Sequence, residues 1–282
     1  GDHRDLPSFP TRRSSDLGKI YENRVYDGRG RAEKDAELVM GPNIRDWPEM
    51  PALSEDILLK VVSEIHDPVT TTDELIPSGE TSSYRSNPEA LAEFALSRRD
   101  PAYVGEAKIV RALETKRAGF AAGYGADESL QEVMDLIETV KTVCPDADLA
   151  RTGIGSTIFA VKPGDGSARE QAASCQKVLG GRANIAGSYA TKRYRSNLIN
   201  WGMLPFVYDG DTDALPFAKG DWIYVPGIRK AVEEGAESAA AYTVGSGMKA
   251  FTLHLGTLTD DERRIILDGC LINHYKAGLA EQ

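Results

Sequence analysis

The segment GDGSARE, residues 164–170, combines a glycine turn with the side chains of Ser167 and Arg169. It lies between a strand predicted over residues 156–161 and a helix predicted over residues 169–179. The free backbone N–H groups of the helix start would share one small volume with both side chains. Such a volume suits a carboxylate, because the helix dipole, the N–H donors and the guanidinium all favour negative charge. The alternative is a simple turn in which Ser167 caps the helix.

A second set of polar residues, from Thr70 to Asn87, lies in a loop expected over residues 67–88, which is dense in Thr, Ser, Pro and Gly. Asp73 and Arg85 are its candidates for chemistry, and loops of this kind carry function more often than packing. Arg85 is suited to clamp a second carboxylate through its two parallel donors. The alternative is an arginine in contact with solvent.

Basic residues crowd the start of a helix predicted over residues 192–201, namely Lys192, Arg193 and Arg195. Positive charge opposes the helix dipole at that end, so the cluster indicates either an anionic partner or a solvated face. Neighbouring aromatic residues would allow stacking on nucleic-acid bases. The charge of the whole chain argues against this, since binding to phosphates requires a basic face.

The composition is that of an ordinary globular chain. It has 282 residues, a formal net charge of −10, 41% hydrophobic residues and 27% charged residues. No apolar stretch approaches membrane-spanning length, and no secretory signal is visible. We therefore expect a cytoplasmic protein that makes no contact with membrane.

The cysteines and histidines show no metal-binding pattern. Cys144, Cys175 and Cys270 are odd in number and far apart, and the four histidines lack ligand spacing. The chain also has no P-loop, dinucleotide fingerprint or GxSxG motif. We expect reduced thiols and no metal bound by this chain itself.

The chain divides into three parts by texture. Residues 1–17 contain SFPTRRSSDL, which resembles one reading frame of a sequencing-library adapter, so we interpret them as an artefact and the chain as a C-terminal fragment. Residues 18–53 are polar and proline-containing, typical of an interdomain linker or an arm. Residues 54–282 are predicted to form one folded domain.

That domain alternates strands with helices, which predicts an α/β fold with mixed sheets. A helix over residues 127–143 is indicated by an apolar period of three and four, with its Met and Leu stripe in the core. Thr259 and Glu262 form a capping box at the start of the last helix. The other predicted strands cover residues 57–62, 183–186, 204–208, 222–225 and two stretches within 239–256, and the other predicted helices 89–96 and 107–117.

Six motifs together resemble the C-terminal swivel domain of the aconitase family of hydro-lyases. They occur in the family's order over roughly residues 41–225, and they are GPNIRDWPEMPAL, DPVTTTDELIPSG, YRSN, GDGSAREQAA, LGGRANIAGSYATKRYRSNLINWGMLPF and KGDWI. The resemblance implies a β/β/α swivel domain, in which mixed sheets form a barrel-like β core packed with helices. It also implies a reaction that moves a hydroxyl between adjacent carbons of a di- or tricarboxylate. A [4Fe-4S] cluster on domains absent from this chain would act as the Lewis acid.

The resemblance implies a role for each candidate residue. Ser167 matches the serine whose alkoxide removes a proton from carbon. Arg169 and the backbone around Ala168 match the groups that stabilise this alkoxide and hold a substrate carboxylate. Arg85 matches a carboxylate-binding arginine, and Asp73 matches an aspartate that orients active-site groups.

The chain departs from the family pattern at two places. The usual motif has two adjacent serines, whereas Ala168 follows Ser167 here, so the substrate is not necessarily citrate or isocitrate. Asp73-Glu74 replaces Asp-His, which is closer to the bacterial and isopropylmalate-type pattern.

Three readings of the whole protein stay open at this point. The first is a truncated single-chain hydratase, inactive alone, whose partners are the cluster-binding domains of the same enzyme. The second is a separate small subunit that assembles with a cluster-bearing large subunit, as in isopropylmalate isomerases. The third is an RNA-binding regulatory relative.

Overall fold

The computed structural model describes residues 30, 33, 35–79, 81–167, 169–245 and 247–280. The chain divides into two compact units, residues 1–41 and residues 42–282. The adapter-like segment 1–17 lies outside the described residues.

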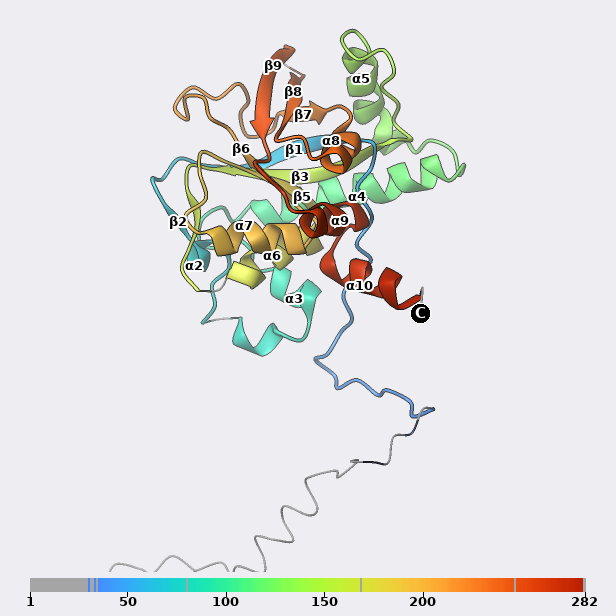
Figure 1. Ribbon diagram of the computed structural model, residues 1–282, viewed down its shortest axis with the longest axis vertical. Coiled ribbons are helices and arrows are strands. Elements are labelled where there is room, and N and C mark those ends of the chain that lie inside the picture. Colours follow the sequence, from blue (N-terminus) through green and yellow to red (C-terminus); the bar gives the residue numbers. More distant parts are fainter. Residues whose placement is uncertain are drawn as a thin grey trace, which may run out of the picture. The chain divides into compact units, whose positions relative to one another are not determined.

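The centre of this unit is a closed β-barrel with the strand order β1, β3, β5, β6, β9, β8, β7 (Figure 1). β1, β3, β5 and β6 are parallel to their neighbours in that order, whereas β7, β8 and β9 pair antiparallel and close the barrel. The strands are β1 (Asp56–Ile65), β3 (Thr152–Ala160), β5 (Gly181–Ala186), β6 (Leu204–Val207), β7 (Trp222–Val225), β8 (Ser238–Val244) and β9 (Lys249–His254). The predicted α/β fold with a barrel-like β core is confirmed.

The parallel strands β1, β3 and β5 are buried along almost their whole length, because both of their faces are covered. In β1, Ile57, Leu59 and Val61 belong to the core inside the barrel. Leu58 and Val62 belong to a second core between the barrel and the helices. A register shift between Val61 and Ser63 interrupts the alternation of faces.

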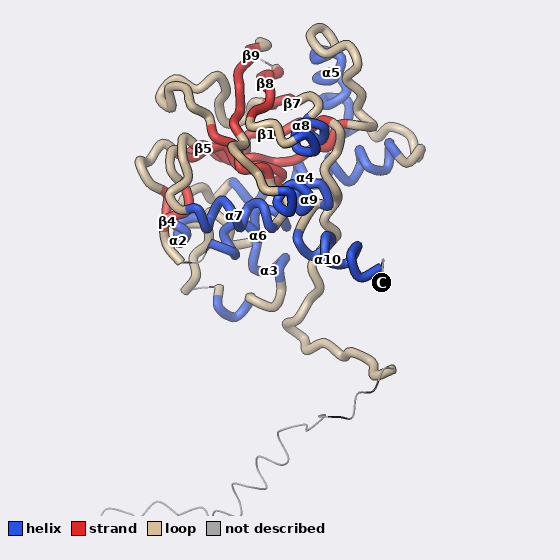
Figure 2. Tube along the Cα trace, in the orientation of Figure 1, coloured by secondary structure: helices blue, strands red, loops and turns tan. Residues whose placement is uncertain are grey.

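Helices cover the outside of the barrel (Figure 2). α4 packs on β1 and β3, while α6 and α7 lie against each other, with α3 on α6. They are α3 (Pro88–Ala92), α4 (Tyr103–Ala121), α5 (Gln131–Val140), α6 (Arg169–Val178), α7 (Lys192–Asn200), α8 (Ile228–Glu234), α9 (Asp260–Asp268) and α10 (Leu271–Ala280). α9 begins at the predicted capping box of Thr259 and Glu262.

The helix predicted over residues 127–143 is a short 3-10 turn, η2 (Glu128–Leu130), followed by α5. Its stripe is core as expected, since Leu130, Val133, Ile137 and Val140 are buried.

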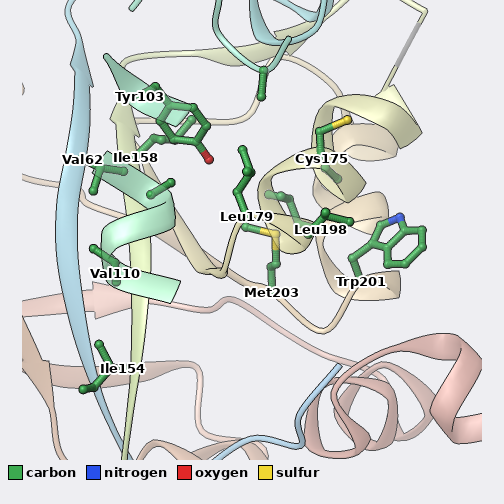
Figure 3. Close-up of a cluster of buried hydrophobic side chains, with 14 of the residues drawn as sticks. Val62, Tyr103, Val110, Ile154, Ile158, Cys175, Leu179, Leu198, Trp201 and Met203 are labelled. Carbon is green, nitrogen blue, oxygen red and sulfur yellow. The ribbon is translucent and has the colours of Figure 1, made fainter. Parts of the chain in front are cut away.

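One continuous core lies between the barrel strands, α4 and the pair of helices α6 and α7 (Figure 3). Tyr103 and Val110 of α4 face Val62, Ile154 and Ile158 of the barrel strands, and Cys175, Leu179, Leu198 and Met203 extend this core to α6 and α7. Burial of such side chains contributes about 1.5–3 kcal/mol each. It therefore fixes α6, whose start carries the candidate site.

Two segments contain regular structure that the sequence pattern did not indicate. The glycine turn expected before the helix at Arg169 holds the short strand β4 (Pro163–Asp165), and the loop expected over residues 67–88 holds its partner β2 (Thr70–Thr71). α2 (Thr72–Leu75) and the 3-10 turn η1 (Ser82–Tyr84) follow β2. Strands of two or three residues show no periodicity, so only their pairing reveals them.

The segment expected to be an arm lies on the second unit from Pro42 onward. Met50 and Leu53 are buried, the Trp47 and Trp201 ring centroids lie 4.4 Å apart with the rings tilted by 44°, and the Arg45 N–H donates to the Ser86 carbonyl. The domain boundary at residue 54 stays a prediction. Within the described part of the chain, no helix has the length and apolar character needed to cross a membrane.

Candidate active site

The candidate site lies where the parallel strands β2 and β4 end (Figure 1). Thr70 pairs with Pro163 and Thr71 with Asp165, so the carboxyl ends of both strands meet at one edge. The chain then continues from β2 into α2, which contains Asp73, and from β4 through Ser167 into α6. This pairing brings together two loops separated by about ninety residues in the sequence.

Gly166 sets the close approach of these loops. Its φ is +121°, and a Cβ at this position would overlap the Oγ1 atom of Thr72. Only glycine has both the backbone freedom and the small size that this position requires. Thr72, directly before Asp73, therefore lies against the residue directly before Ser167.

Asp73 holds its own loop in place. Its Oδ1 atom accepts hydrogen bonds from the Ser78 N–H at 3.1 Å and the Ser78 hydroxyl at 3.3 Å. Its Oδ2 atom accepts one from Arg98 Nη1 at 2.7 Å. Both oxygens are engaged, which suits an aspartate that orients neighbouring groups. Nothing in the sequence around Arg98 indicated this partner.

α2 is also fastened at its start by a capping box between Thr71 and Glu74. The Glu74 N–H donates to Thr71 Oγ1 at 3.2 Å, and the Thr71 N–H donates to the Glu74 carboxylate at 2.7 Å. The sequence Thr-x-x-Glu is the signal that reveals this cap.

Ser167 lies two residues after the end of β4, and Arg169 begins α6. The Ser167 side chain is exposed, and none of the described residues hydrogen-bonds to its hydroxyl. Arg169 is the first residue of α6 and is half-buried, and its Nε atom is buried without a hydrogen-bond partner among the described residues. Ala168, the other predicted substrate contact, lies outside the described residues.

An unpartnered buried N–H is costly, by about 1–3 kcal/mol. Arg169 therefore keeps an unused donor next to an exposed hydroxyl at a helix start, where an anion is favoured.

Arg85 lies apart from these contacts. It follows η1 and is exposed, and no described side chain or carbonyl accepts a hydrogen bond from its guanidinium. The next helix, α3, is capped by Asn87 and packs on α6. The loop of Arg85 is thus tied to the helix that Arg169 begins, although no contact joins the two arginines.

Tyr194 of α7 contacts β4, α6 and β5 next to the candidate site. A Cβ on Gly164 of β4 would overlap its ring, and its hydroxyl accepts hydrogen bonds from Gln176 of α6 at 2.9 Å and Asn184 of β5 at 2.8 Å. Burial raises the pKa of the Tyr194 phenol, so this hydroxyl stays neutral. Thr191 adds a hydrogen bond from its hydroxyl to the Gly164 carbonyl at 3.1 Å.

The basic residues at the start of α7 differ in their contacts. Arg195 Nη2 donates to the Leu255 carbonyl at 2.8 Å, which ties α7 to the chain after β9. Lys192 and Arg193 are exposed. Since Thr191 bonds to β4, their charges belong to the same end of the unit as the β4 edge.

The described residues do not fit a metal cluster. No group of three or more His, Cys, Asp or Glu side chains gathers among them in an arrangement suited to a metal ion. Cys144 follows α5, Cys175 lies in α6 and Cys270 lies between α9 and α10. Burial raises the pKa of the Cys175 thiol to about 12, which disfavours the thiolate that binds metals.

Part of the chain that includes Ser167 matches a known protein family. Residues 132–211 match the model described as the aconitase C-terminal domain, and this stretch includes β4, Ser167 and the start of α7. This segment is similar to the aconitase C-terminal domain. The resemblance carried by GDGSARE and by the long motif over residues 179–206 is confirmed, whereas KGDWI lies beyond the matched stretch. Asp73 and Arg85 lie before the matched stretch of the aconitase C-terminal domain, and the roles of all the candidate residues stay predictions.

Among solved structures, the chain is similar to a 3-isopropylmalate dehydratase (LeuD) from Methanocaldococcus jannaschii. The identity is 21%, the TM-score is 0.45, and the match covers 80% of this chain and 97% of the other. No curated protein matches the sequence.

Proposed function

We propose that the chain is the swivel domain of an iron–sulfur hydro-lyase that dehydrates and rehydrates a di- or tricarboxylic hydroxy acid. The observation that carries the proposal is the edge where β2 and β4 end. There an exposed Ser167 hydroxyl precedes a helix whose first residue, Arg169, keeps a buried donor without a partner. The family of the matched segment supports the same reading.

In this proposal Ser167 acts as the base. An ordinary alcohol is far too weak an acid to ionise near neutral pH, so its alkoxide needs nearby donors and a cation. Arg169 and the N–H groups at the start of α6 would supply them. The alkoxide would then remove a proton from the substrate carbon next to the one that carries the hydroxyl.

The positive groups around the edge would hold the substrate. Arg169 and Arg85 would each bind a carboxylate through paired donors, and Asp73 would position its loop through Ser78 and Arg98. The [4Fe-4S] cluster would be bound by domains or a subunit outside this sequence.

The first experiment reads the source DNA upstream of codon 18. An open frame with three cysteines at cluster-binding spacing would make this chain part of one hydratase. A start codon near Gly18 would make it a small subunit and direct the search to a large one. The assembled enzyme from either route then serves for assay with unsaturated di- and tricarboxylates, followed by ultraviolet absorbance.

Ser167→Ala in that enzyme is expected to lower kcat by at least about a thousandfold, because the base is lost, while the fold is retained. Ser238→Ala, an exposed serine of β8, is the matched control and should leave turnover unchanged. Wild-type turnover in Ser167→Ala would refute the assignment of the base.

Arg85→Lys is expected to raise KM with little effect on kcat, because a lysine cannot form the paired donor contact. Arg264→Lys, an exposed arginine of α9, is its control. An unchanged KM in Arg85→Lys would remove Arg85 from the binding site.

A further inference from the structure

A separate cavity of about 330 Å³ lies at the other end of α6. Its walls are α4, the turn from α6 into β5, and the segment from Pro48 to Pro51. Lys177, which lines it, follows Arg169 by eight residues, or about 12 Å along the helix axis. The cavity is therefore distinct from the edge that carries Ser167.

Its lining is basic. Arg111, Arg117, Lys177 and Arg182 contribute to it, against Glu49 and Glu114. When Lys177 is protonated, this leaves an excess of two positive charges. A cavity lined by one sign of charge attracts ions of the opposite sign.

One carboxylate, that of Glu114, already serves two of these arginines. It accepts from Arg117 Nε at 2.7 Å and Nη2 at 2.9 Å, and from Arg182 Nη2 at 3.1 Å. Arg182 Nη1 also donates to the Pro51 carbonyl at 3.2 Å. These two guanidiniums are thus held in place by the protein itself.

The other two basic groups keep unused donors. Lys177 is 4% exposed, and its Nζ atom is buried without a hydrogen-bond partner among the described residues. Arg111 Nη2 donates a hydrogen bond to Glu89 Oε1 at 3.0 Å, and no described residue accepts one from its other guanidinium nitrogens.

Backbone packing brings Lys177 and Arg111 together. The Gly180 N–H donates to the Lys177 carbonyl, and a Cβ on Gly180 would lie 2.9 Å from Arg111 Cβ. The stem of Arg111 therefore crosses the turn that ends α6. The two side chains with spare donors line the same cavity from facing elements.

A buried amine without a partner is rare, because both its charge and its N–H groups lose water. Burial, and next the charge of Arg182, lower the pKa of Lys177 to about 7, while Cys270 acts in the opposite direction. The other charged groups around the cavity are Arg111, Glu114 and Arg117 of α4, and Glu49. Lys177 Nζ has almost no solvent-accessible surface, so the side chain would turn toward the cavity to give the amine an anionic acceptor there.

The rest of the wall is apolar. Met50, Ile154 and Val178 line the cavity together with Pro48 and Pro51. A volume of this size lies at the lower end of the range for small-molecule sites. The ligand that fits is thus an anionic head joined to a short apolar body.

We propose that this cavity is a second ligand site, which binds a small organic anion through Lys177 and Arg111. The head of the ligand is a carboxylate or a phosphate, and its apolar body lies against Met50, Ile154 and Val178. The site is independent of the proposed hydro-lyase reaction.

Calorimetry on the full chain tests this with two probes, sulfate for the anionic head and 4-methylpentanoate for a head with an apolar body. We expect saturable binding of both, tighter for 4-methylpentanoate. Lys177→Met and Arg111→Gln should each weaken it about tenfold or more, since a charge-assisted hydrogen bond is lost. Arg85→Lys should leave it unchanged, which separates this site from the one at Ser167.

Protonation gives a second readout. Binding should be accompanied by proton uptake at pH 8, seen as a heat that depends on the buffer, and Lys177→Met should abolish the uptake. Absence of saturable binding, or equal binding by wild type and a folded Lys177→Met variant, would overturn the proposal. A loss in Arg85→Lys that matches the loss in Lys177→Met would also overturn it, because the probes would then occupy the other site.

Discussion

Replacing Lys177 with methionine should stabilise the protein, by an amount that depends on pH. Methionine fills nearly the same volume without a charge or an N–H group. Burial lowers the pKa of Lys177 from 10.5 to about 7 in the folded state. Below pH 7 the amine carries its proton in both states, so the full cost of burying the charge is subtracted from the free energy of unfolding. At about 1.4 kcal/mol for each tenfold change, this cost is about 5 kcal/mol.

The sign follows from the protons bound in each state. Between pH 7 and 10.5 the unfolded chain holds the proton and the folded chain does not, so the contribution to the free energy of unfolding rises with pH. From pH 6 to pH 9 the wild type should gain about 3 kcal/mol relative to Lys177→Met. The advantage of the variant should therefore be large at pH 6 and much smaller at pH 9.

Urea denaturation of both proteins at pH 6 and pH 9 measures this difference. All other titrating groups are common to both and largely cancel. Lys230→Met, at a lysine whose side chain is 73% exposed, is the control and should show no such dependence. A difference between wild type and Lys177→Met that is the same at both pH values would refute the reasoning, because Lys177 would then titrate normally.

Two further substitutions test the packing behind both sites. Glu114→Gln should destabilise the protein by about 3–5 kcal/mol, because the Arg182 guanidinium would stay buried without its counter-charge. The substitution would also weaken the acceptor of the Ile154 N–H. A loss of stability below about 1 kcal/mol in urea denaturation would show that solvent replaces the carboxylate. Gly164→Ala should lower the free energy of unfolding by about 1–3 kcal/mol, since the new Cβ would overlap the Tyr194 ring and the φ of this residue is +94°. An unchanged free energy of unfolding would mean that β4 can move away from α7 without cost.

Local signals in the sequence predicted several of the elements that surround the candidate site. The turn before α6 was predicted from Gly164 and Gly166, and the helix start at Arg169 agrees with the structure. The stripe of α5 and the capping box at Thr259 depend only on residues three or four apart. The motif around Ser167 also carried the family resemblance.

Other features had no local signal. In α6, Ser174, Gln176 and Lys177 are all buried, so the helix shows no clear apolar face that would have revealed a buried lysine. The pairing of Asp73 with Arg98 joins residues twenty-five positions apart, in segments that read as polar loop. Such contacts depend on which elements pack together.

The sequence by itself determined the types of the main elements and the chemistry available at each motif, because backbone periodicity, caps and side-chain groups are local properties. Only the tertiary structure decided that β2 pairs with β4, so that Thr72 contacts Gly166 and Asp73 lies in the same corner as Ser167. It also decided that the end of α6 faces α4, so that Lys177 loses water and acceptors. The physical reason is that strand pairing and burial depend on how segments distant in the sequence pack together in the closed barrel and its covering helices.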